Sequence, residues 1–390
     1  MLRVMLLFGT RPEAIKMIPL IEEARRRADQ IDLTICISAQ HKEMLFQVLE
    51  LFQISPDIDL DVMQPGQTLF DVTARVLTGL KEKAFDAVKP DWLIVQGDTT
   101  TTMSGALGAF YGDVKIGHVE AGLRTGDRYS PFPEEVNRRI CTLVAHQHWA
   151  PTESAKSNLL REAVPEADVF VTGNTAIDTL RHVSERYSAT AIRAHISEHQ
   201  PGLHAALQAA DAHRLIVVTM HRRESFGSPI REVCRALREI VRRHPDVALI
   251  YPVHLNPNVR GVVHDLLSEE ERIHLVEPAD YLSFVGLMQA AAIIITDSGG
   301  VQEEAPYFGK PVLVLRDVTE RMEAVEYGTA RLVGRDYEAI TGQAHLLLTD
   351  DDEYAKMSNA VNPYGDGHAA RRIFDALLGL PVDEFAVSSK

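Results

Sequence analysis

Residues 293–304 read IIITDSGGVQEE, and this stretch decides the fold of the chain. Its first four residues are all β-branched, which is typical of a buried parallel strand. Gly299 and Gly300 follow the strand and open a predicted helix. Two glycines at this point let backbone N–H groups approach a diphosphate closely, and Glu304, about one turn into the helix, can bind the ribose hydroxyls. The alternative is an ordinary glycine turn without a ligand.

The same rhythm, a short apolar run followed by a longer amphipathic stretch, extends outward over most of the chain, as expected for parallel strands joined by crossover helices. The predicted strands are residues 4–8, 33–37, 92–95, 114–119 and 169–172 in the first half, and residues 215–219, 248–253, 273–276, 293–296 and 312–315 in the second half. The sequence therefore predicts an α/β fold made of two doubly wound parallel-sheet domains.

A polar stretch without strand signals, residues 181–213, separates the two sets of strands, and we place the domain junction there. The predicted N-terminal domain is residues 1–180, and the predicted C-terminal domain is residues 181–366. An amphipathic helix is expected from about residue 367 to residue 380, and it would cross back so that residues 367–390 join the first domain. The tail after Pro381 is expected to be frayed.

Length, charge and composition exclude several classes of protein. A chain of 390 residues suits two cores, and 45% hydrophobic with 24% charged residues is the balance of an ordinary globular protein. The net charge of -15 argues against general binding to nucleic acid or to anionic membranes, so neither partner is expected. A phosphate site, if there is one, must be local.

The cysteine pattern and the lengths of the apolar runs indicate in which cellular compartment the protein is found. Cys36, Cys141 and Cys234 lie far apart, so neither a disulfide framework nor a zinc site is indicated. No apolar run is long enough to span a membrane, and the first run, residues 4–8, is too short for a signal peptide. These features predict a cytoplasmic protein.

Two cations follow the first predicted strand, at the edge where ligands of open α/β sheets bind. The segment GTRPE, residues 9–13, carries Arg11, and Lys16 comes about one turn later in the predicted helix. A helix N-terminus already favours anions, so this loop could hold a phosphate. The alternative is a simple turn with a solvated Arg11.

Three carboxylates are predicted at the same edge. They are Asp98 in QGDTTTT, Glu120 in HVEAGLR and Glu134 in SPFPEEVNR. Each has a structural alternative: Asp98 as a helix N-cap, Glu120 in an ion pair with Arg124, and Glu134 as a partner of the helix dipole. Crowding three like charges costs energy, so the set indicates acid–base chemistry.

His221 directly follows another predicted strand, where a histidine is suited to proton transfer or to hydrogen bonding with a phosphate, although a lone histidine there is more often structural. The chain has no Walker loop, no GxGxxG with an acidic residue about twenty positions later, and no HExxH. We therefore expect neither a cofactor nor a metal.

Six motifs occur in one order along nearly the whole chain: GTRPE, QGDTTT, HVEAGLRT, SPFPEEVNR, HRRE and DSGGVQEEAP. With these the chain closely resembles the non-hydrolysing bacterial UDP-N-acetylglucosamine 2-epimerases. The resemblance implies a GT-B architecture, with two Rossmann-like domains and the nucleotide sugar in the interdomain cleft, and it implies a homodimer.

Site residues follow from the same resemblance. The catalytic positions match Asp98, Glu120, Glu134 and His221. The positions that bind the uridine diphosphate match Arg11, Lys16, Phe284, Ser298, Gly299, Gly300, Glu304 and Arg321. The family's uracil loop often carries a polar residue where Ala279 stands, so only a main-chain contact is expected there.

Some relatives have a regulatory nucleotide-sugar site that includes the pair matching Gln40 and His41. This chain has Gly66 where those relatives have a basic residue, which leaves activation by substrate open.

The implied reaction is reversible inversion of carbon 2, from UDP-N-acetylglucosamine to UDP-N-acetylmannosamine, for surface polysaccharide precursors. The implied route is elimination of UDP to 2-acetamidoglucal and readdition. The alternatives are a GT-B glycosyltransferase, a 2-epimerase of diacetamido uronic acid UDP-sugars, a hydrolysing epimerase and a non-catalytic nucleotide-sugar sensor. The carboxylates argue against the sensor, and the lack of a fused kinase domain argues against the hydrolysing enzyme.

Overall fold

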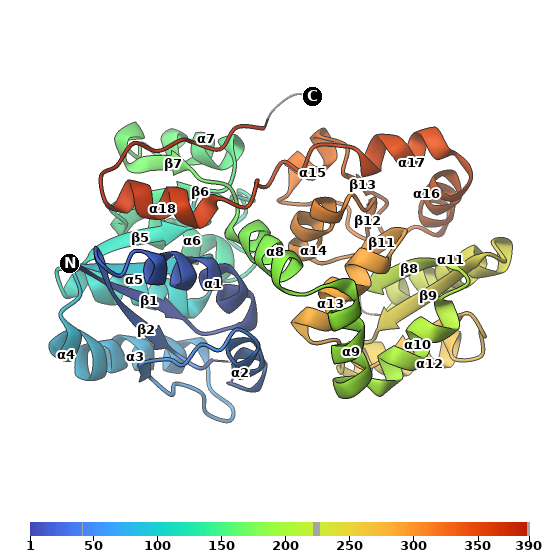
Figure 1. The fold of residues 1–390 in the computed structure, drawn as a ribbon, viewed down its shortest axis with the longest axis horizontal. Coiled ribbons are helices and arrows are strands. Elements are labelled where there is room, and N and C mark those ends of the chain that lie inside the picture. The colour runs from blue at the N-terminus through green and yellow to red at the C-terminus, as the bar shows by residue number, and fades with distance from the viewer. Residues whose placement is uncertain (41, 221–226, 388–390) are drawn as a thin grey trace. The chain divides into compact units, whose positions relative to one another are not determined.

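The chain forms two compact units. The structure, a computed structural model, describes residues 1–40, 42–220 and 227–387. The first unit comprises Met1–Arg181 together with Tyr364–Val387, and the second unit comprises His182–Pro363 (Figure 1).

The first unit contains a sheet of seven parallel strands in the order β3-β2-β1-β4-β5-β6-β7. These strands are β1 (Leu2–Phe8), β2 (Ile31–Ile37), β3 (Ile58–Asp59), β4 (Trp92–Gln96), β5 (Lys115–Val119), β6 (Gln147–Ala150) and β7 (Val169–Val171). The order in the sheet reverses relative to the chain between β1 and β4, which is where doubly wound sheets bind their ligands.

Helices cover both faces of this sheet. They are α1 (Arg11–Arg26), α2 (Lys42–Leu51), α3 (Leu69–Gly79), α4 (Asp86–Val88), α5 (Thr100–Tyr111), α6 (Glu134–Val144), α7 (Glu153–Arg161), α8 (Thr175–Arg186) and α18 (Ala369–Leu377). Met5 and Leu7 pack with residues of α3 and α5, while their neighbours Val4 and Leu6 are buried on the opposite face. A side chain at Gly105 of α5 would come within 2.4 Å of Leu7, so the small residues of this helix allow close packing on the sheet.

The second unit repeats the arrangement with six parallel strands in the order β10-β9-β8-β11-β12-β13. They are β8 (Arg214–Thr219), β9 (Val247–Pro252), β10 (Ile273–Val276), β11 (Ile293–Thr296), β12 (Val312–Val314) and β13 (Ala330–Leu332). Its helices are α9 (Ala189–His199), α10 (Pro201–Ala210), α11 (Ser228–Arg243), α12 (Pro257–Leu267), α13 (Tyr281–Ala290), α14 (Gly299–Glu304), α15 (Met322–Glu326), α16 (Tyr337–Thr349) and α17 (Asp351–Ser358). The reversal of strand order falls between β8 and β11.

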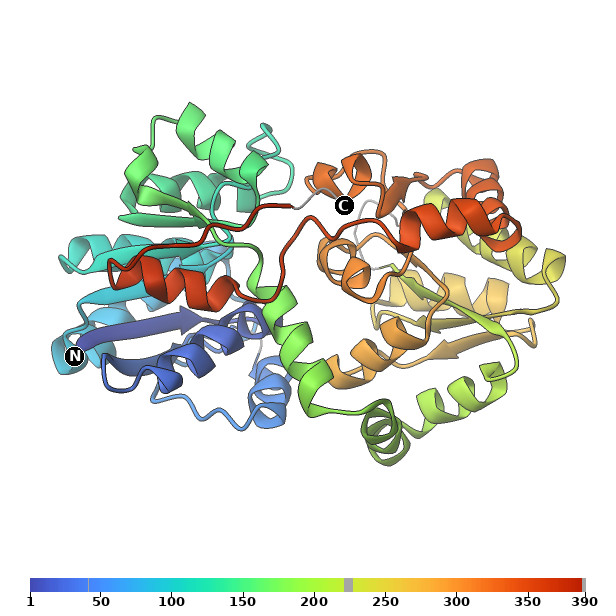
Figure 2. The ribbon, with the colours of Figure 1, turned by 45° about the horizontal axis from the view of Figure 1, so that its top comes forward.

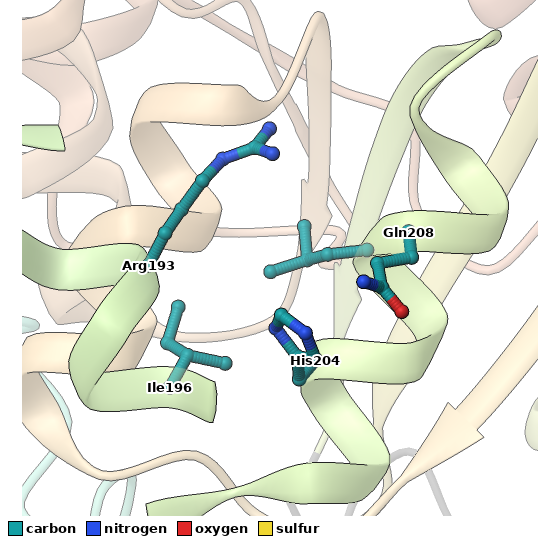
Figure 3. A pocket seen from close by; sticks show the side chains of 5 residues that line it. Arg193, Ile196, His204 and Gln208 are labelled. Atoms are coloured by element: carbon teal, nitrogen blue, oxygen red, sulfur yellow. The ribbon is translucent and has the colours of Figure 1, made fainter. Parts of the chain in front are cut away.

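These sheets confirm the predicted α/β class with two doubly wound parallel sheets. Strands β3, β6 and β13 were not predicted, because they are short or, like Gln147–Ala150, carry polar residues. The predicted junction, residues 181–213, is mostly helical and contains α9 and α10. A small pocket lies where these two helices meet, and Figure 3 shows Arg193 and Ile196 facing it from one helix and His204 and Gln208 from the other.

The predicted frayed tail is wrong for residues up to Val387. Phe385 is buried, and its backbone N–H donates to the Val171 carbonyl of β7 over 2.8 Å. Lys156 pairs with Glu384 at 3.1 Å. The segment after α18 therefore packs along the first unit, as Figure 2 shows. Among the helices of the described part of the chain, none is long and apolar enough to cross a membrane.

Candidate active site

The carboxyl edge of the first sheet gathers most of the polar residues singled out above. Arg11 is the first residue of α1, directly after β1, and Lys16 lies farther along the same helix. Asp98 follows β4, and Glu120 follows β5. Because β1, β4 and β5 are neighbours in the sheet, their loops meet at one place.

Glu120 lies at the centre of this edge. Its backbone has a φ of +63°, a left-handed conformation that is rare for a residue with a side chain and is often found at functional positions. Lys16 Nζ donates to Glu120 Oε1 over 2.6 Å, and Gln96 donates to Glu120 Oε2. The Glu120 carboxylate also lies beside Gly97, where an added Cβ would be 3.8 Å from Oε2. The alternative role of Glu120, an ion pair with Arg124, is wrong, because Lys16 and Gln96 bind its carboxylate.

Asp98 is held by helix α6. Arg138 donates to Asp98 Oδ2 through Nε over 2.9 Å and through Nη2 over 2.6 Å. Asn137 Nδ2 donates to the Asp98 backbone carbonyl over 2.9 Å. The N-cap of α5 is Thr99, whose side chain accepts from the Thr102 backbone N–H, so the alternative role of Asp98 as that N-cap is wrong.

Glu134 and Glu135 occupy the first turn of α6, as predicted. Glu135 is fully buried, and its carboxylate accepts from Arg138 and Arg139 and from the Thr125 backbone N–H over 3.1 Å. Glu134, one residue earlier, is half-buried. The start of α6 thus brings Glu134 to the edge that carries Asp98 and Glu120.

Arg124 turns away from Glu120 and pairs with Glu162. Its Nη2 lies 2.7 Å from Glu162 Oε2, and its Nε donates to Oε1 over 2.8 Å. This pair fixes the loop after β5 on α7. The partner of Glu120 comes instead from α1, 104 positions away in the chain.

Glu13 ties two of the loops together, a role that was not predicted. Its Oε2 accepts from the backbone N–H groups of Gly9 and Thr10, over 3.0 and 2.8 Å, and its Oε1 accepts from the hydroxyls of Thr99 and Thr102, over 2.7 and 2.9 Å. Burial raises the pKa of Glu13, while hydrogen bonds from Thr99 and Thr10 act in the opposite direction. The sequence signal was the capping-box spacing from Thr10 to Glu13.

His118 supports the same loops from β5. Its Nε2 lies 2.7 Å from the Gly97 carbonyl oxygen and therefore carries the proton. Burial lowers the pKa of His118 to about 4, so the ring is neutral at pH 7. It positions the backbone next to Asp98.

The predicted regulatory pair is only partly described. Gln40 follows β2, and its side-chain oxygen accepts from the Thr101 hydroxyl over 3.1 Å. His41 lies outside the described residues. Gly66 stands in the loop before α3 with a φ of +70°.

The second sheet carries the predicted diphosphate loop at the carboxyl end of β11. Ser298 is the N-cap of α14, and its backbone N–H donates to Thr296 Oγ1 over 2.9 Å. Gly299 lies directly against Arg321, because an added Cβ would be 2.8 Å from the guanidinium carbon. At Gly300 an added Cβ would be 3.9 Å from Glu304 Oε1. The structure therefore brings Ser298, Gly299, Gly300, Glu304 and Arg321 together.

Two buried carboxylates hold Arg321. Its Nε donates to Glu303 Oε1 over 2.9 Å, and its Nη1 donates to Glu320. Arg316 pairs with the other oxygen of Glu320 at 2.9 Å. The resemblance implies Arg321 but not its two acidic partners, because these pairings depend on how the loop after β12 folds back onto α14.

Phe284 lies in the first turn of α13 and is half-buried. Asp280, the N-cap of that helix, accepts from the Ser283 backbone N–H over 2.8 Å. Asp280 Oδ2 also lies 3.1 Å from His195 Nε2, and it accepts from Gln200 over 3.1 Å.

His221, predicted to act with the three carboxylates, lies outside the described part of the chain. The described residues hold no cluster of three or more His, Cys, Asp or Glu that could bind a metal.

Comparison with known proteins gives one family. A family model described as UDP-N-acetylglucosamine 2-epimerase matches residues 23–378. The UDP-N-acetylglucosamine 2-epimerase of Yersinia pestis is 52% identical over 377 residues, which cover 96% of this chain and 98% of that protein.

Solved structures agree with the family match. The UDP-GlcNAc 2-epimerase of Neisseria meningitidis, crystallised bound to UDP-GlcNAc, is 45% identical, with a TM-score of 0.88 over 97% of this chain and 100% of that one. The Methanocaldococcus jannaschii UDP-GlcNAc 2-epimerase, solved in complex with UDP-GlcNAc and UDP, is 32% identical, with a TM-score of 0.79 over 97% of this chain and 100% of that one. These relatives have the GT-B-like fold.

Proposed function

Since this chain belongs to the UDP-N-acetylglucosamine 2-epimerase family, we propose that it interconverts UDP-N-acetylglucosamine and UDP-N-acetylmannosamine by inverting carbon 2. The observation that carries the proposal is the set of carboxylates at the carboxyl edge of the first sheet. Asp98 and Glu120 flank Gly97, and Glu134 opens the helix whose Arg138 binds Asp98. Inversion needs proton-transfer groups on both faces of the sugar, and we assign these roles to the three carboxylates.

The substrate dictates the route. Carbon 2 carries an acetamido group and no neighbouring carbonyl, so its proton is a poor acid. In the proposed reaction a carboxylate takes this proton, the C–H electron pair forms the double bond between carbons 1 and 2, and the C1–O bond breaks with its electrons on a UDP phosphate oxygen. The resulting 2-acetamidoglucal accepts a proton on its other face while UDP re-forms the C1–O bond.

UDP must leave carbon 1 and stay bound until it adds back, so its negative charge has to be stabilised. Preorganised cations and backbone N–H groups are the usual means, and they often supply the largest catalytic effect. We assign this role to the diphosphate loop of the second unit, with Gly299, Gly300 and Arg321. His221 would bond the diphosphate or the leaving oxygen.

The test is proton NMR of the protein with UDP-N-acetylglucosamine in deuterium oxide. Formation of UDP-N-acetylmannosamine with deuterium at carbon 2, together with slow release of UDP and 2-acetamidoglucal, is the expected result. Substitution of Asp98, Glu120 or Glu134 by its amide should lower the rate by about 100-fold or more. Glu153→Gln, which changes an exposed carboxylate of the same unit, is the control. Binding without turnover would refute the proposal for this sugar and favour a uronic acid variant or an acceptor-dependent transfer.

We also propose that two copies associate through the first unit. Helices α5 and α6 both run back from the carboxyl ends of strands, so their last turns lie near each other at the opposite edge. There Phe110, Tyr111 and Leu143 are exposed, the last at 84%. Contiguous exposed apolar side chains are typical of interaction sites. Leu143→Lys should shift the protein from dimer to monomer in light scattering, whereas Leu380→Lys should not.

A cytoplasmic location is proposed as well. The three cysteines are free and buried, and burial raises the pKa of each thiol, which fits a protein that folds without disulfides in a reducing compartment. Cell fractionation with a periplasmic marker tests this location.

A further inference from the structure

Helix α6 carries a buried arginine that binds Asp98. The Arg138 side chain is only 5% exposed, and all of its guanidinium nitrogens are engaged. Nε and Nη2 donate to Asp98, and Nη1 donates to Glu135 Oε2 over 3.4 Å. A buried pair of this kind contributes little net stability, because desolvation cancels much of the attraction. Its position next to a reacting carboxylate therefore calls for another explanation.

The geometry is asymmetric at Asp98. Both bonds from Arg138 end on Oδ2, and within the described part of the chain Oδ1 has no hydrogen-bond partner. The Asp98 side chain remains 28% exposed. Arg138 thus engages one carboxylate oxygen and leaves the other available for a proton.

The same helix sets the position of a second carboxylate. Glu134 and Arg138 are four residues apart in α6, so they lie on one face of the helix. Asn137 adds a bond from α6 to the Asp98 backbone carbonyl. Helix α6 therefore fixes the position of Glu134 relative to Asp98.

Glu135 supports the arrangement from behind. It is fully buried and touches Arg138 but not Asp98, and it also accepts from the Thr125 backbone N–H in the loop that follows Glu120. Its second oxygen binds Arg139 over 3.1 Å. Arg139 shares the helix and the partner with Arg138, yet its side chain is 51% exposed.

We propose that Arg138 is a positioning residue that orients Asp98 for proton transfer, with Oδ1 as the reacting atom and with Glu135 holding Arg138 in place. This assignment rests on the proposed epimerase function. Misplacing a reacting group by about 1 Å can lower the rate about 100-fold. We therefore expect loss of Arg138 to lower kcat and to leave KM nearly unchanged.

The test compares three variants in the carbon 2 epimerisation assay. Arg138→Ala should lower kcat about 100-fold with KM within about threefold, and added guanidinium ion should restore part of the loss. Arg138→Lys keeps the positive charge but loses the planar guanidinium that donates two hydrogen bonds to Asp98, so it should lower kcat about 10-fold. Arg139→Ala, the matched control, should keep kcat within about twofold. Combined with Asp98→Asn, the Arg138→Ala change should add nothing further, since both act through one carboxylate.

Folding is checked separately by thermal melts with and without UDP, which should still raise the melting temperature of Arg138→Ala. If that variant does not fold, Arg138→Lys decides, and wild-type turnover by it would overturn the assignment. An effect on KM alone, or no rescue by guanidinium, would also overturn it. A wild-type protein that leaves the substrate unchanged would instead refute the proposed function, and the assignment with it.

Discussion

Glu120 is a buried carboxylate that pairs with a cation from another element, Lys16 of α1. Its side chain is 7% exposed and that of Lys16 is 12% exposed, with 2.6 Å between Nζ and Oε1. Removing one partner of a buried pair leaves a charge in a poorly solvated place, which typically costs about 3–5 kcal/mol. The loop geometry at Glu120 therefore depends on Lys16.

Lys16→Met should accordingly lower the free energy of unfolding by about 3 kcal/mol in urea titrations, because the buried ion pair with Glu120 is lost. The double variant Lys16→Met with Glu120→Gln should recover much of this loss while staying inactive. Arg260→Met, which breaks an exposed pair with Glu277, should cost less than about 1 kcal/mol. Equal losses for the two single variants would contradict the buried-pair interpretation.

At this scale the sequence indicates residue types but not pairings. Strand ends marked Asp98, Glu120 and Lys16 as edge residues, because polar residues after apolar runs lie at the carboxyl edge. That Lys16 rather than Arg124 meets Glu120, and that Arg138 meets Asp98 across 40 positions, depends on how separate loops pack. Spacing along one helix cannot predict such contacts.

At the scale of elements, α18 is held to the first unit by a carboxylate from α8. Asp178 Oδ2 accepts from the Ala369 backbone N–H over 3.1 Å, and Oδ1 accepts from the Ala370 N–H over 2.8 Å. The N-cap residue of α18, His368, makes no side-chain cap. Asp178 thus supplies the cap from a distant segment.

Asp178→Ala should destabilise the protein by about 1–3 kcal/mol and speed hydrogen exchange in α18, since two helix N–H groups lose their acceptor. Asp178→Asn should have a smaller effect, because its oxygen still accepts. The comparison variant is Asp350→Ala, which uncaps α17 in the second unit and should leave exchange in α18 unchanged. Unchanged α18 protection in Asp178→Ala would contradict the capping role.

Elements with strong patterns were predictable and weak ones were not. Buried strands such as Ile293–Thr296 are made of β-branched residues and were predicted with the observed bounds. Strand β6 has the sequence QHWA, and it is a strand because it pairs with β5, not because of its composition. The order of C-terminal residues 381–387 likewise comes from tertiary contacts with β7.

At the scale of the whole molecule, buried titratable groups of the first unit make its stability vary with pH, and three of them have large pKa shifts. Burial lowers the pKa of His118 from 6.5 to about 4 and that of His148, its neighbour across β5 and β6, from 6.5 to about 3. Burial raises the pKa of Asp178 from 3.8 to about 6. The histidines and the aspartate act in opposite directions.

The first unit should lose stability as the pH falls from 7 to 5. The neutral forms of His118 and His148 stabilise the fold above pH 6.5. This contribution is lost as the pH falls below 6.5, because the two histidines become protonated in the unfolded chain while they stay neutral in the folded chain. Protonated Asp178 stabilises the fold, fully below pH 3.8, and this contribution is lost as the pH rises through about 6. Acidification from pH 7 to 5 therefore regains part of the stability that the histidines lose. With about 1.4 kcal/mol per pKa unit, the two histidines outweigh Asp178, and these three groups together lower the free energy of unfolding by on the order of 2 kcal/mol.

Both tryptophans, Trp92 and Trp149, lie in the first unit, so urea unfolding followed by their fluorescence reports on it directly. His148→Gln should flatten the dependence of the unfolding free energy on pH between 7 and 5, because one of the two buried histidines then no longer takes up a proton on unfolding. His199→Gln, an exposed position in the second unit, should keep the wild-type slope. A first unit that gains stability on acidification would mean that Asp178 outweighs the histidine pair.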